Sequence, residues 1–300
     1  MNQDSPRHST VISASRRTDI PAYYTPWFLN RLKEGHAIYK NPFTGKIFRL
    51  SLKAEEVHSI VFWSRDYSKL IPYLKELHKR DYRFYFHFTL TGHPKILDPN
   101  VIQPVEAIRQ FQTLSQMFSP DHMQWRFDPL IITDVTPVEQ LISTFSKLAG
   151  KLKKSTRRCT ISFAHLYGKV RRNLNKLEEE SGVKHYEIPD DEKYDIAQKI
   201  AEIAADHGMR VYSCCCPNLI GGLVQQAHCI DQKILRLLFP ERPLKGKVTP
   251  TRKGCGCFSS RDIGAYNTCP QGCIYCYANA NPSVGVKSFQ NHKPDSPSLS

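Results

Sequence analysis

The feature that most restricts the fold is a regular alternation of short apolar runs with helical runs. Strand candidates follow one another at residues 11–15, 59–63, 83–90, 124–132, 160–166 and 210–214. Segments with helical spacing of apolar residues separate several of them, at 70–80, 105–117, 138–152 and 194–207. Strands that alternate with helices of about 10–15 residues indicate βαβ units and a parallel sheet. The sequence therefore predicts an α/β fold, a (β/α) barrel, partial or closed, with about six βα units.

The predicted units divide the chain into three parts. Residues 1–216 are expected to form the barrel, with a short helix after Pro26 and an inserted hairpin at 37–52 around Asn-Pro-Phe-Thr-Gly. Residues 217–280, with a short helix at 234–239, are expected to form a cysteine-rich module packed on the barrel mouth. Residues 281–300 are polar and rich in Pro and Ser, which is typical of a disordered tail.

Composition narrows the class of protein. Apolar residues make up 40% of the 300 residues, which is enough for a globular core. The formal net charge of +14 excludes an acidic solvating protein and favours an anionic partner or substrate. No run approaches the roughly 18 apolar residues of a membrane span, and the first ten residues lack the apolar stretch of a secretion signal. We expect a cytoplasmic protein with no membrane partner.

Cysteine is concentrated at one end of the chain. Nine of the ten cysteines follow residue 213, and only Cys159 stands apart, at a strand where a buried small side chain is expected. Structural disulfides are rare in the cytoplasm, so this distribution indicates a metal or redox module.

The most specific motif is Cys269-Pro-Gln-Gly-Cys273-Ile-Tyr-Cys276, a CxxxCxxC spacing. Thiolates are the usual ligands of iron–sulfur clusters, and a cubane takes four. Three thiolates in one short loop can hold three irons and leave the fourth open for a substrate or cofactor. The main alternative is a zinc site that combines Cys273 and Cys276 with Cys255 and Cys257.

The loop, together with Tyr-Asn-Thr at 266–268 and Tyr-Cys-Tyr-Ala at 275–278, resembles the radical S-adenosylmethionine superfamily, especially its spore photoproduct lyase-like branch. The resemblance implies a 4Fe–4S cluster on Cys269, Cys273 and Cys276, with S-adenosylmethionine bound at the open iron. One-electron reduction would cleave the sulfonium of S-adenosylmethionine and yield a 5′-deoxyadenosyl radical. The resemblance also implies an electron donor such as flavodoxin or ferredoxin.

One departure from that superfamily concerns position. In most members this loop follows the first strand, whereas here it follows all six predicted units. Either the fold is circularly permuted, or the loop folds back over the barrel mouth.

Most of residues 11–280 also resemble a bacterial family known only as a domain of unknown function, DUF1848. The matching segments include Ser-Arg-Arg-Thr-Asp-Ile-Pro at 15–21, Asn-Pro-Phe at 41–43, Val-Phe-Trp at 61–63, Phe-Thr-Leu-Thr-Gly at 88–92, Trp-Arg-Phe-Asp-Pro at 125–129, Cys-Ile-Asp at 229–231 and the module from Cys255 to Ala278. This family has no established reaction, so the resemblance supports the fold and leaves the substrate open.

A second set of cysteines is formed by Cys229, Cys255, Cys257 and one of three consecutive cysteines. Cys214 is favoured as the fourth member over Cys215 and Cys216, because it comes first at the end of the sixth strand. Four thiolates suit an auxiliary iron–sulfur cluster or a zinc ion, and a set without metal is the third alternative.

Chemistry in such folds lies at the carboxyl ends of the strands. Arg16, Asp19, Arg126 and Asp128 lie at two of these ends and are the candidate catalytic residues. A charge bracketed by apolar strand residues needs a partner, and the planar fork of arginine binds carboxylates. The candidate contacts to S-adenosylmethionine or an anionic substrate are Arg16, Arg17, Arg126 and Tyr275.

Two hypotheses about function follow. The first is a radical S-adenosylmethionine-like enzyme of unknown substrate. The second is a zinc- or iron–sulfur-containing protein that binds nucleic acid through basic runs such as those at 151–158 and 169–172, without radical chemistry. A radical enzyme that acts on nucleic acid would combine the two.

Overall fold

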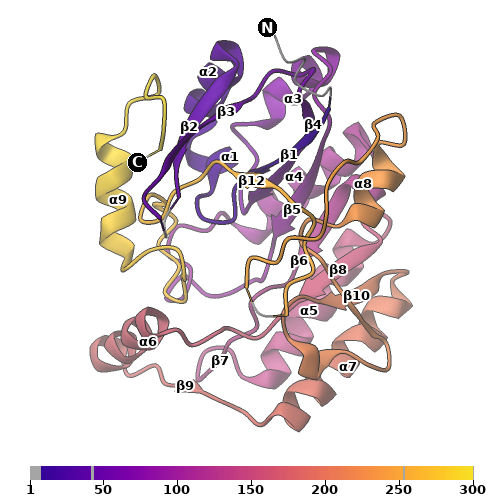
Figure 1. Cartoon of the computed structure of the whole chain (residues 1–300). Coiled ribbons are helices and arrows are strands. Elements are labelled where there is room, and N and C mark those ends of the chain that lie inside the picture. Colours follow the sequence, from indigo (N-terminus) through magenta and orange to yellow (C-terminus); the bar gives the residue numbers. More distant parts are fainter. Residues whose placement is uncertain (1–7, 42–43, 253, 300) are drawn as a thin grey trace, which may run out of the picture.

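The computed structural model describes residues 8–41, 44–252 and 254–299. Its centre is one eight-stranded sheet with the strand order β11-β10-β8-β6-β5-β4-β1-β12 (Figure 1). Every neighbouring pair in this sheet is parallel. The strands are β1 (Thr10–Ala14), β4 (Val57–Ser64), β5 (Phe84–Thr89), β6 (Met123–Arg126), β8 (Arg158–Ile161), β10 (Arg210–Ser213), β11 (Val224–Gln226) and β12 (Arg261–Asp262).

The six strands predicted from the sequence correspond to six neighbouring strands of this sheet, which are β1, β4, β5, β6, β8 and β10. The prediction of an α/β fold with a parallel sheet is therefore confirmed. Closure into a barrel is not. Among the described residues, β11 and β12 are the two outer strands, and each pairs only with its inner neighbour. The strand predicted at 124–132 ends at Arg126, and a single parallel bridge between Leu130 and Phe163 follows it.

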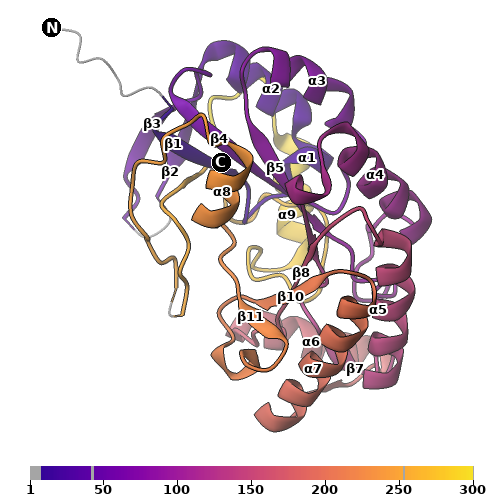
Figure 2. The same cartoon turned by 90° about the vertical axis from the view of Figure 1, so that its right-hand side faces the viewer.

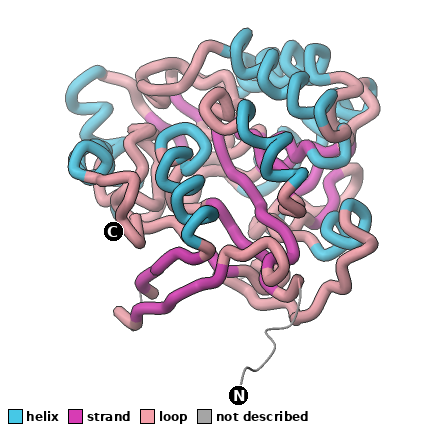
Figure 3. Tube along the Cα trace, turned by 90° about the horizontal axis from the view of Figure 1, so that it is seen from above, coloured by secondary structure: helices cyan, strands magenta, loops and turns pink. Residues whose placement is uncertain are grey.

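Most of the helices cover one face of the sheet. Figure 2 shows them in an arc around the strands, and Figure 3 shows the same arrangement from above. In the described part of the chain, no helix combines the length and the apolar character that crossing a membrane requires. The helices are α1 (Ile20–Tyr23), α2 (Thr25–Glu34), α3 (Ile71–Lys79), α4 (Pro104–Met117), α5 (Val138–Leu152), α6 (Gly168–Ser181), α7 (Asp190–Asp206), α8 (Gln232–Leu238) and α9 (Pro282–Asn291), with 3-10 turns η1 (Pro120–His122) and η2 (Pro217–Leu219).

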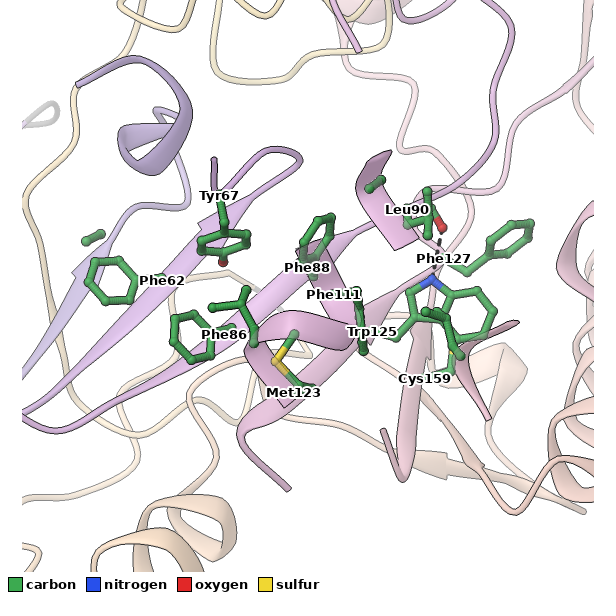
Figure 4. Packing of buried hydrophobic residues seen from close by; sticks show 14 of the residues in the cluster. Phe62, Tyr67, Phe86, Phe88, Leu90, Phe111, Met123, Trp125, Phe127 and Cys159 are labelled. Atoms are coloured by element: carbon green, nitrogen blue, oxygen red, sulfur yellow. Dashed lines mark hydrogen bonds between the residues drawn. The ribbon is translucent and has the colours of Figure 1, made fainter. Parts of the chain in front are cut away.

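The main core lies between these helices and the sheet. Aromatic side chains from β4, β5 and β6 fill it, including Phe62, Phe86 and Trp125 (Figure 4). The Trp125 ring stacks on Phe145 with centroids 4.9 Å apart, and its Nε1–H donates to the Leu90 carbonyl at 2.9 Å. Cys159 is fully buried in this core, as expected for a structural cysteine.

The opposite face of the sheet is covered by the C-terminal third of the chain. Side chains alternate along a strand, so Ile12 belongs to the helix-covered core while Val11 points to the other side. There Val11, Val61 and Tyr85 pack against residues of α8 and against Cys255 and Cys257. The cysteine-rich segment is therefore built into the second face of the sheet.

Two small antiparallel sheets complete the fold. The predicted hairpin is present as β2 (His36–Lys40) and β3 (Ile47–Ser51), while Pro42 and Phe43 of its turn lie outside the described residues. The second pair is β7 (Ile132–Thr133) with β9 (His185–Tyr186).

The prediction of a disordered tail is wrong for the described residues 281–299. Helix α9 begins at Asn281, whose side chain caps it by accepting from the Val284 N–H, and lies against the N-terminal helices (Figure 1). Phe289 packs edge-on against Tyr23 and Tyr24, with centroids 5.6 and 5.3 Å apart. The Trp27 Nε1–H donates to the Ser296 carbonyl at 2.9 Å. These partners lie far away along the chain, so the polar composition of the tail does not indicate whether it is ordered.

Replacing Phe289 with Ala tests the contribution of the tail. We expect the free energy of unfolding to fall by about 2 kcal/mol, because a half-buried aromatic side chain is lost. Urea unfolding measures this, with Lys287→Ala on the exposed side of α9 as the matched control. Equal stability of the two variants would show that the tail does not contribute to folding.

A buried histidine on β4 makes stability depend on pH. His58 Nε2 hydrogen-bonds to the Arg242 carbonyl at 3.3 Å, and the nearby charges are those of Arg242, His8 and Glu241. Burial lowers the pKa of His58 from 6.5 to about 4. The folded protein keeps this ring neutral, so acid favours the unfolded chain, which binds the proton at the ordinary pKa. The stabilisation is complete above pH 6.5 and is lost as pH falls towards 4.

His58→Gln removes this proton uptake and keeps an N–H donor for Arg242. Between pH 7 and pH 5, the wild type should lose about 2 kcal/mol more stability than the variant. Urea unfolding at both pH values measures the difference, and identical losses in the two proteins would contradict the assignment.

Candidate functional site

The cysteine loop is attached to the sheet through β12. This strand has two residues, and Asp262 lies beside Ser13 of β1. The Asp262 carboxylate accepts hydrogen bonds from Ser13 Oγ at 2.8 Å, Ser15 Oγ at 2.6 Å and the Arg16 N–H at 2.9 Å. It also forms an ion pair with Arg17 at 3.2 Å and accepts from the Gly264 N–H. One carboxylate therefore fixes the end of β1 and the start of the loop.

Asp262 was not among the predicted site residues. It is the single acidic residue between Arg242 and Asn281, in a strongly basic segment, and that contrast was the signal available in the sequence. Gly264 permits the close approach, since a Cβ there would lie 2.0 Å from Ser15 Oγ. Arg17, predicted to bind a cofactor, has its guanidinium paired with Asp262.

The loop itself packs on the turn between β1 and α1. Thr268 Oγ1 lies 2.6 Å from Thr18 Oγ1, and the Tyr24 hydroxyl donates to the Thr268 carbonyl at 2.6 Å. The side chain of Asn279 donates to the Cys269 carbonyl at 2.7 Å. The loop that carries the CxxxCxxC motif is thus held by polar contacts from both sides.

The structure brings Cys269, Cys273 and Cys276 together at this end of the sheet, each within electrostatic range of the others. The Cys269 sulfur accepts the backbone N–H groups of Asp19 and Gln271. The Cys276 sulfur accepts the Ala278 N–H at 3.3 Å. Burial raises the pKa of the Cys269 thiol to about 12, so a thiolate there needs a bound cation. Backbone N–H donors to sulfur are typical of cluster-binding loops.

Tyr275, inside this loop, belongs to a buried polar network. Its hydroxyl donates to Asp98 at 2.6 Å and accepts from Arg65 Nη2 at 2.6 Å and from His93 Nδ1 at 3.1 Å. Burial alone would raise the pKa of Asp98, but Arg65 and His93 hold it well below its usual value. The hydroxyl of this predicted cofactor contact is therefore committed to positioning the loop.

Asp19 links the ends of two strands. Its carboxylate accepts from Ser64 Oγ at 2.5 Å, the Arg65 N–H at 3.0 Å and the Ala22 N–H at 3.1 Å. Burial raises the pKa of Asp19 to about 6, and these three donors oppose the rise. Its side chain fixes the turn whose backbone N–H reaches Cys269.

Two arginines share one indole on the second face of the sheet. The guanidinium carbons of Arg16 and Arg126 lie 5.5 and 5.3 Å from the Trp63 ring centroid. Arg126 also pairs with Asp128, which in turn accepts from Ser162 Oγ. We expected a charge at these strand ends to have a partner, and for Arg126 that partner is Asp128.

Arg16 keeps one unpartnered nitrogen. Among the described residues, its Nη2 is buried and finds no hydrogen-bond partner. The ionisable groups near it are Asp262, Cys257, Cys229 and Tyr277.

The second cysteine set contains five thiols instead of four. Side-chain contacts run in a closed circuit from Cys214 to Cys215, Cys255, Cys257, Cys229 and back to Cys214. The Sγ–Sγ distance is 3.6 Å between Cys214 and Cys215 and 3.3 Å between Cys229 and Cys214. We call these five residues the thiol ring. Within the described ranges, no group of three or more His, Cys, Asp or Glu is arranged to hold a single metal ion.

Cys216 is not part of the thiol ring. With Cys215 it lines a pocket of about 330 Å³ at the carboxyl ends of β8 and β10. The pocket is enclosed by apolar and ionisable side chains, which include Leu130, Phe163, His165, His185, Glu187 and Lys193.

Replacing Asp262 with Ala tests whether this carboxylate fixes the loop. Its hydrogen-bonded groups would lose a nearly buried acceptor, so we expect the free energy of unfolding to fall by about 3–5 kcal/mol. Urea unfolding measures the loss against Glu202→Ala, at an exposed position of α7. Losses of similar size in both variants would show that Asp262 is dispensable.

Comparison with known proteins identifies a family. No curated protein matches the sequence. The family model described as "Domain of unknown function (DUF1848)" matches residues 11–278, which include both cysteine sets and all of the parallel sheet except Thr10 at the start of β1. The chain therefore belongs to the DUF1848 family.

Proposed function

We propose that this protein is a radical S-adenosylmethionine-like enzyme whose 4Fe–4S cluster is held by Cys269, Cys273 and Cys276. The observation that carries the proposal is the place of these thiols, one buried and two partly exposed, in a single loop that follows a strand at the carboxyl edge of a parallel sheet. Three thiols in this loop leave the fourth iron of a cubane for a cofactor.

The strand order supports the circularly permuted alternative. In space the sheet begins with β12 and continues through β1, β4, β5, β6, β8 and β10. A loop that follows β12 therefore occupies the place of a loop after the first strand of the sheet, although it comes late in the sequence. This arrangement agrees with a partial (β/α) barrel whose first strand has moved to the C-terminus.

The residues of the loop fit such a cluster. The N–H donors to Cys269 and Cys276 stabilise thiolate over thiol. With S-adenosylmethionine bound, the cluster would supply a 5′-deoxyadenosyl radical through one-electron reductive cleavage.

The chain's own residues would bind and orient the reactants. Arg16, at the carboxyl end of β1 beside the loop, is the first candidate to bind a carboxylate of the cofactor or an anionic substrate. Arg126 and Asp128 already pair with each other, so they would orient a ligand as a unit. Asp19 would position the loop through its backbone N–H, which donates to Cys269. Arg17 would position the loop through its ion pair with Asp262.

An anionic substrate is favoured by the charge near the loop. The Tyr266 ring lies under the Arg17 guanidinium and the Lys169 ammonium, at 5.4 and 5.6 Å from its centroid. Nucleic acid is one such polyanion. Because the reaction needs low-potential electrons, we propose a flavodoxin- or ferredoxin-type donor in the cytoplasm.

The test is reductive cleavage of S-adenosylmethionine by the anaerobically purified protein with dithionite as the electron source. We expect 5′-deoxyadenosine and methionine in equal amounts, and at least a tenfold lower rate for Cys276→Ser, because one thiolate of the cluster is lost. Cys159→Ala, which changes a buried thiol outside both sets, is the control. An iron-loaded wild type that forms no 5′-deoxyadenosine would refute the proposal.

A further inference from the structure

The thiol ring has a chemical environment of its own. Four of its five sulfurs have a donor from outside the ring. The Ile230 N–H reaches Cys257 at 3.5 Å, and Thr251 Oγ1 reaches Cys255 at 3.5 Å. Arg126 Nη1 reaches Cys229 at 3.6 Å, and the Arg252 side chain hydrogen-bonds to Cys215. Donors aimed at sulfur stabilise thiolates more than thiols.

Positive charge surrounds the ring. Arg126 and Arg252 contact two of its sulfurs directly, and Arg16 interacts with Cys257 and Cys229. Cys257 is 1% exposed, so a group of thiolates here is poorly solvated. Buried negative charge needs compensation, and Arg252 contributes to it together with Arg126 and Arg16, which also interact with Asp128 and Asp262.

Two buried donors on neighbouring side chains lack acceptors among the described residues. They are Arg16 Nη2 and Trp63 Nε1. Trp63 packs in the same apolar cluster as Cys229, Cys255 and Cys257. A buried donor without an acceptor is costly, and so its occurrence beside a ring of sulfurs points to a missing acceptor.

We propose that the thiol ring holds an iron–sulfur cluster of its own, separate from the one proposed on Cys269, Cys273 and Cys276. Its ligands are Cys229, Cys255, Cys257 and one of the adjacent pair Cys214 and Cys215. An iron–sulfur cluster carries inorganic sulfides, which accept hydrogen bonds in addition to those accepted by its thiolates. A zinc ion brings no acceptor of its own for the indole and the guanidinium.

The two cysteine sets adjoin each other through one residue. The hydroxyl of Tyr277, which follows Cys276, donates to the Arg16 carbonyl at 2.6 Å. The Arg16 guanidinium lies within electrostatic range of Cys257 and Cys229. The inference does not depend on radical chemistry, because it concerns only what the ring binds.

The experiment uses the full chain without the first set, as the variant Cys269→Ser/Cys273→Ser/Cys276→Ser. After anaerobic purification and reconstitution with iron and sulfide, we expect about four irons and four sulfides per chain. Adding Cys229→Ser and Cys257→Ser to this triple variant should reduce the iron and the sulfide content to background. Cys216→Ser is the matched control, since it changes the same cysteine triplet outside the ring, and it should retain the full content.

The outcome that overturns the proposal is about one zinc per chain with Zn–S distances of about 2.3 Å by X-ray absorption, or no bound iron. Iron that remains bound after the added change Cys229→Ser/Cys257→Ser would overturn the proposal as well.

Circular dichroism checks that the variants fold. Thiol alkylation of the reconstituted triple variant gives a second readout that needs no change in the ring. Cys229, Cys255 and Cys257 should be protected, and their rapid labelling in iron-loaded protein would contradict the assignment.

Discussion

The arrangement of the site depends on the Asp262 carboxylate. Strand β12 has only two residues, so backbone pairing alone would hold it weakly against β1. Asp262 adds hydrogen bonds to Ser13, Ser15 and Arg16 and an ion pair with Arg17. This single side chain places the late cysteine loop beside the first strand of the chain. Asp19 acts similarly at the next strand end, where it joins the turn after β1 to β4.

The two faces of the sheet carry different kinds of side chain. The face under the helices is packed with aromatic rings such as Phe62, Phe86 and Trp125, which make a dry core. The other face carries Trp63, Arg16 and Arg126, and the C-terminal segment closes over it with its cysteines. Because side chains alternate along a strand, Phe62 and Trp63 serve these two faces from adjacent positions.

The two cysteine sets are stabilised by different means. Around Cys269 and Cys276 the donors are backbone N–H groups of the loop and of the β1–α1 turn. Around the thiol ring they include the guanidinium groups of Arg126 and Arg252. In the first set the charges of Arg65 and Lys169 act from nearby, whereas in the second set guanidinium groups contact the sulfurs themselves. We propose a catalytic cluster for the first set and a separate, fully ligated cluster for the second.

The sequence by itself determined the parallel sheet, the order of its six main strands and the CxxxCxxC loop, because periodicity and ligand spacing are local properties. Tertiary structure alone decided the role of Asp262, the partners of Arg17 and Tyr275, and the membership of Cys215 in the thiol ring. It also showed that residues 282–291 form a helix where polar composition predicted disorder. The physical reason is distance along the chain. Asp262 meets Ser13 across 249 positions and Tyr275 meets Asp98 across 177, and no local pattern encodes such contacts.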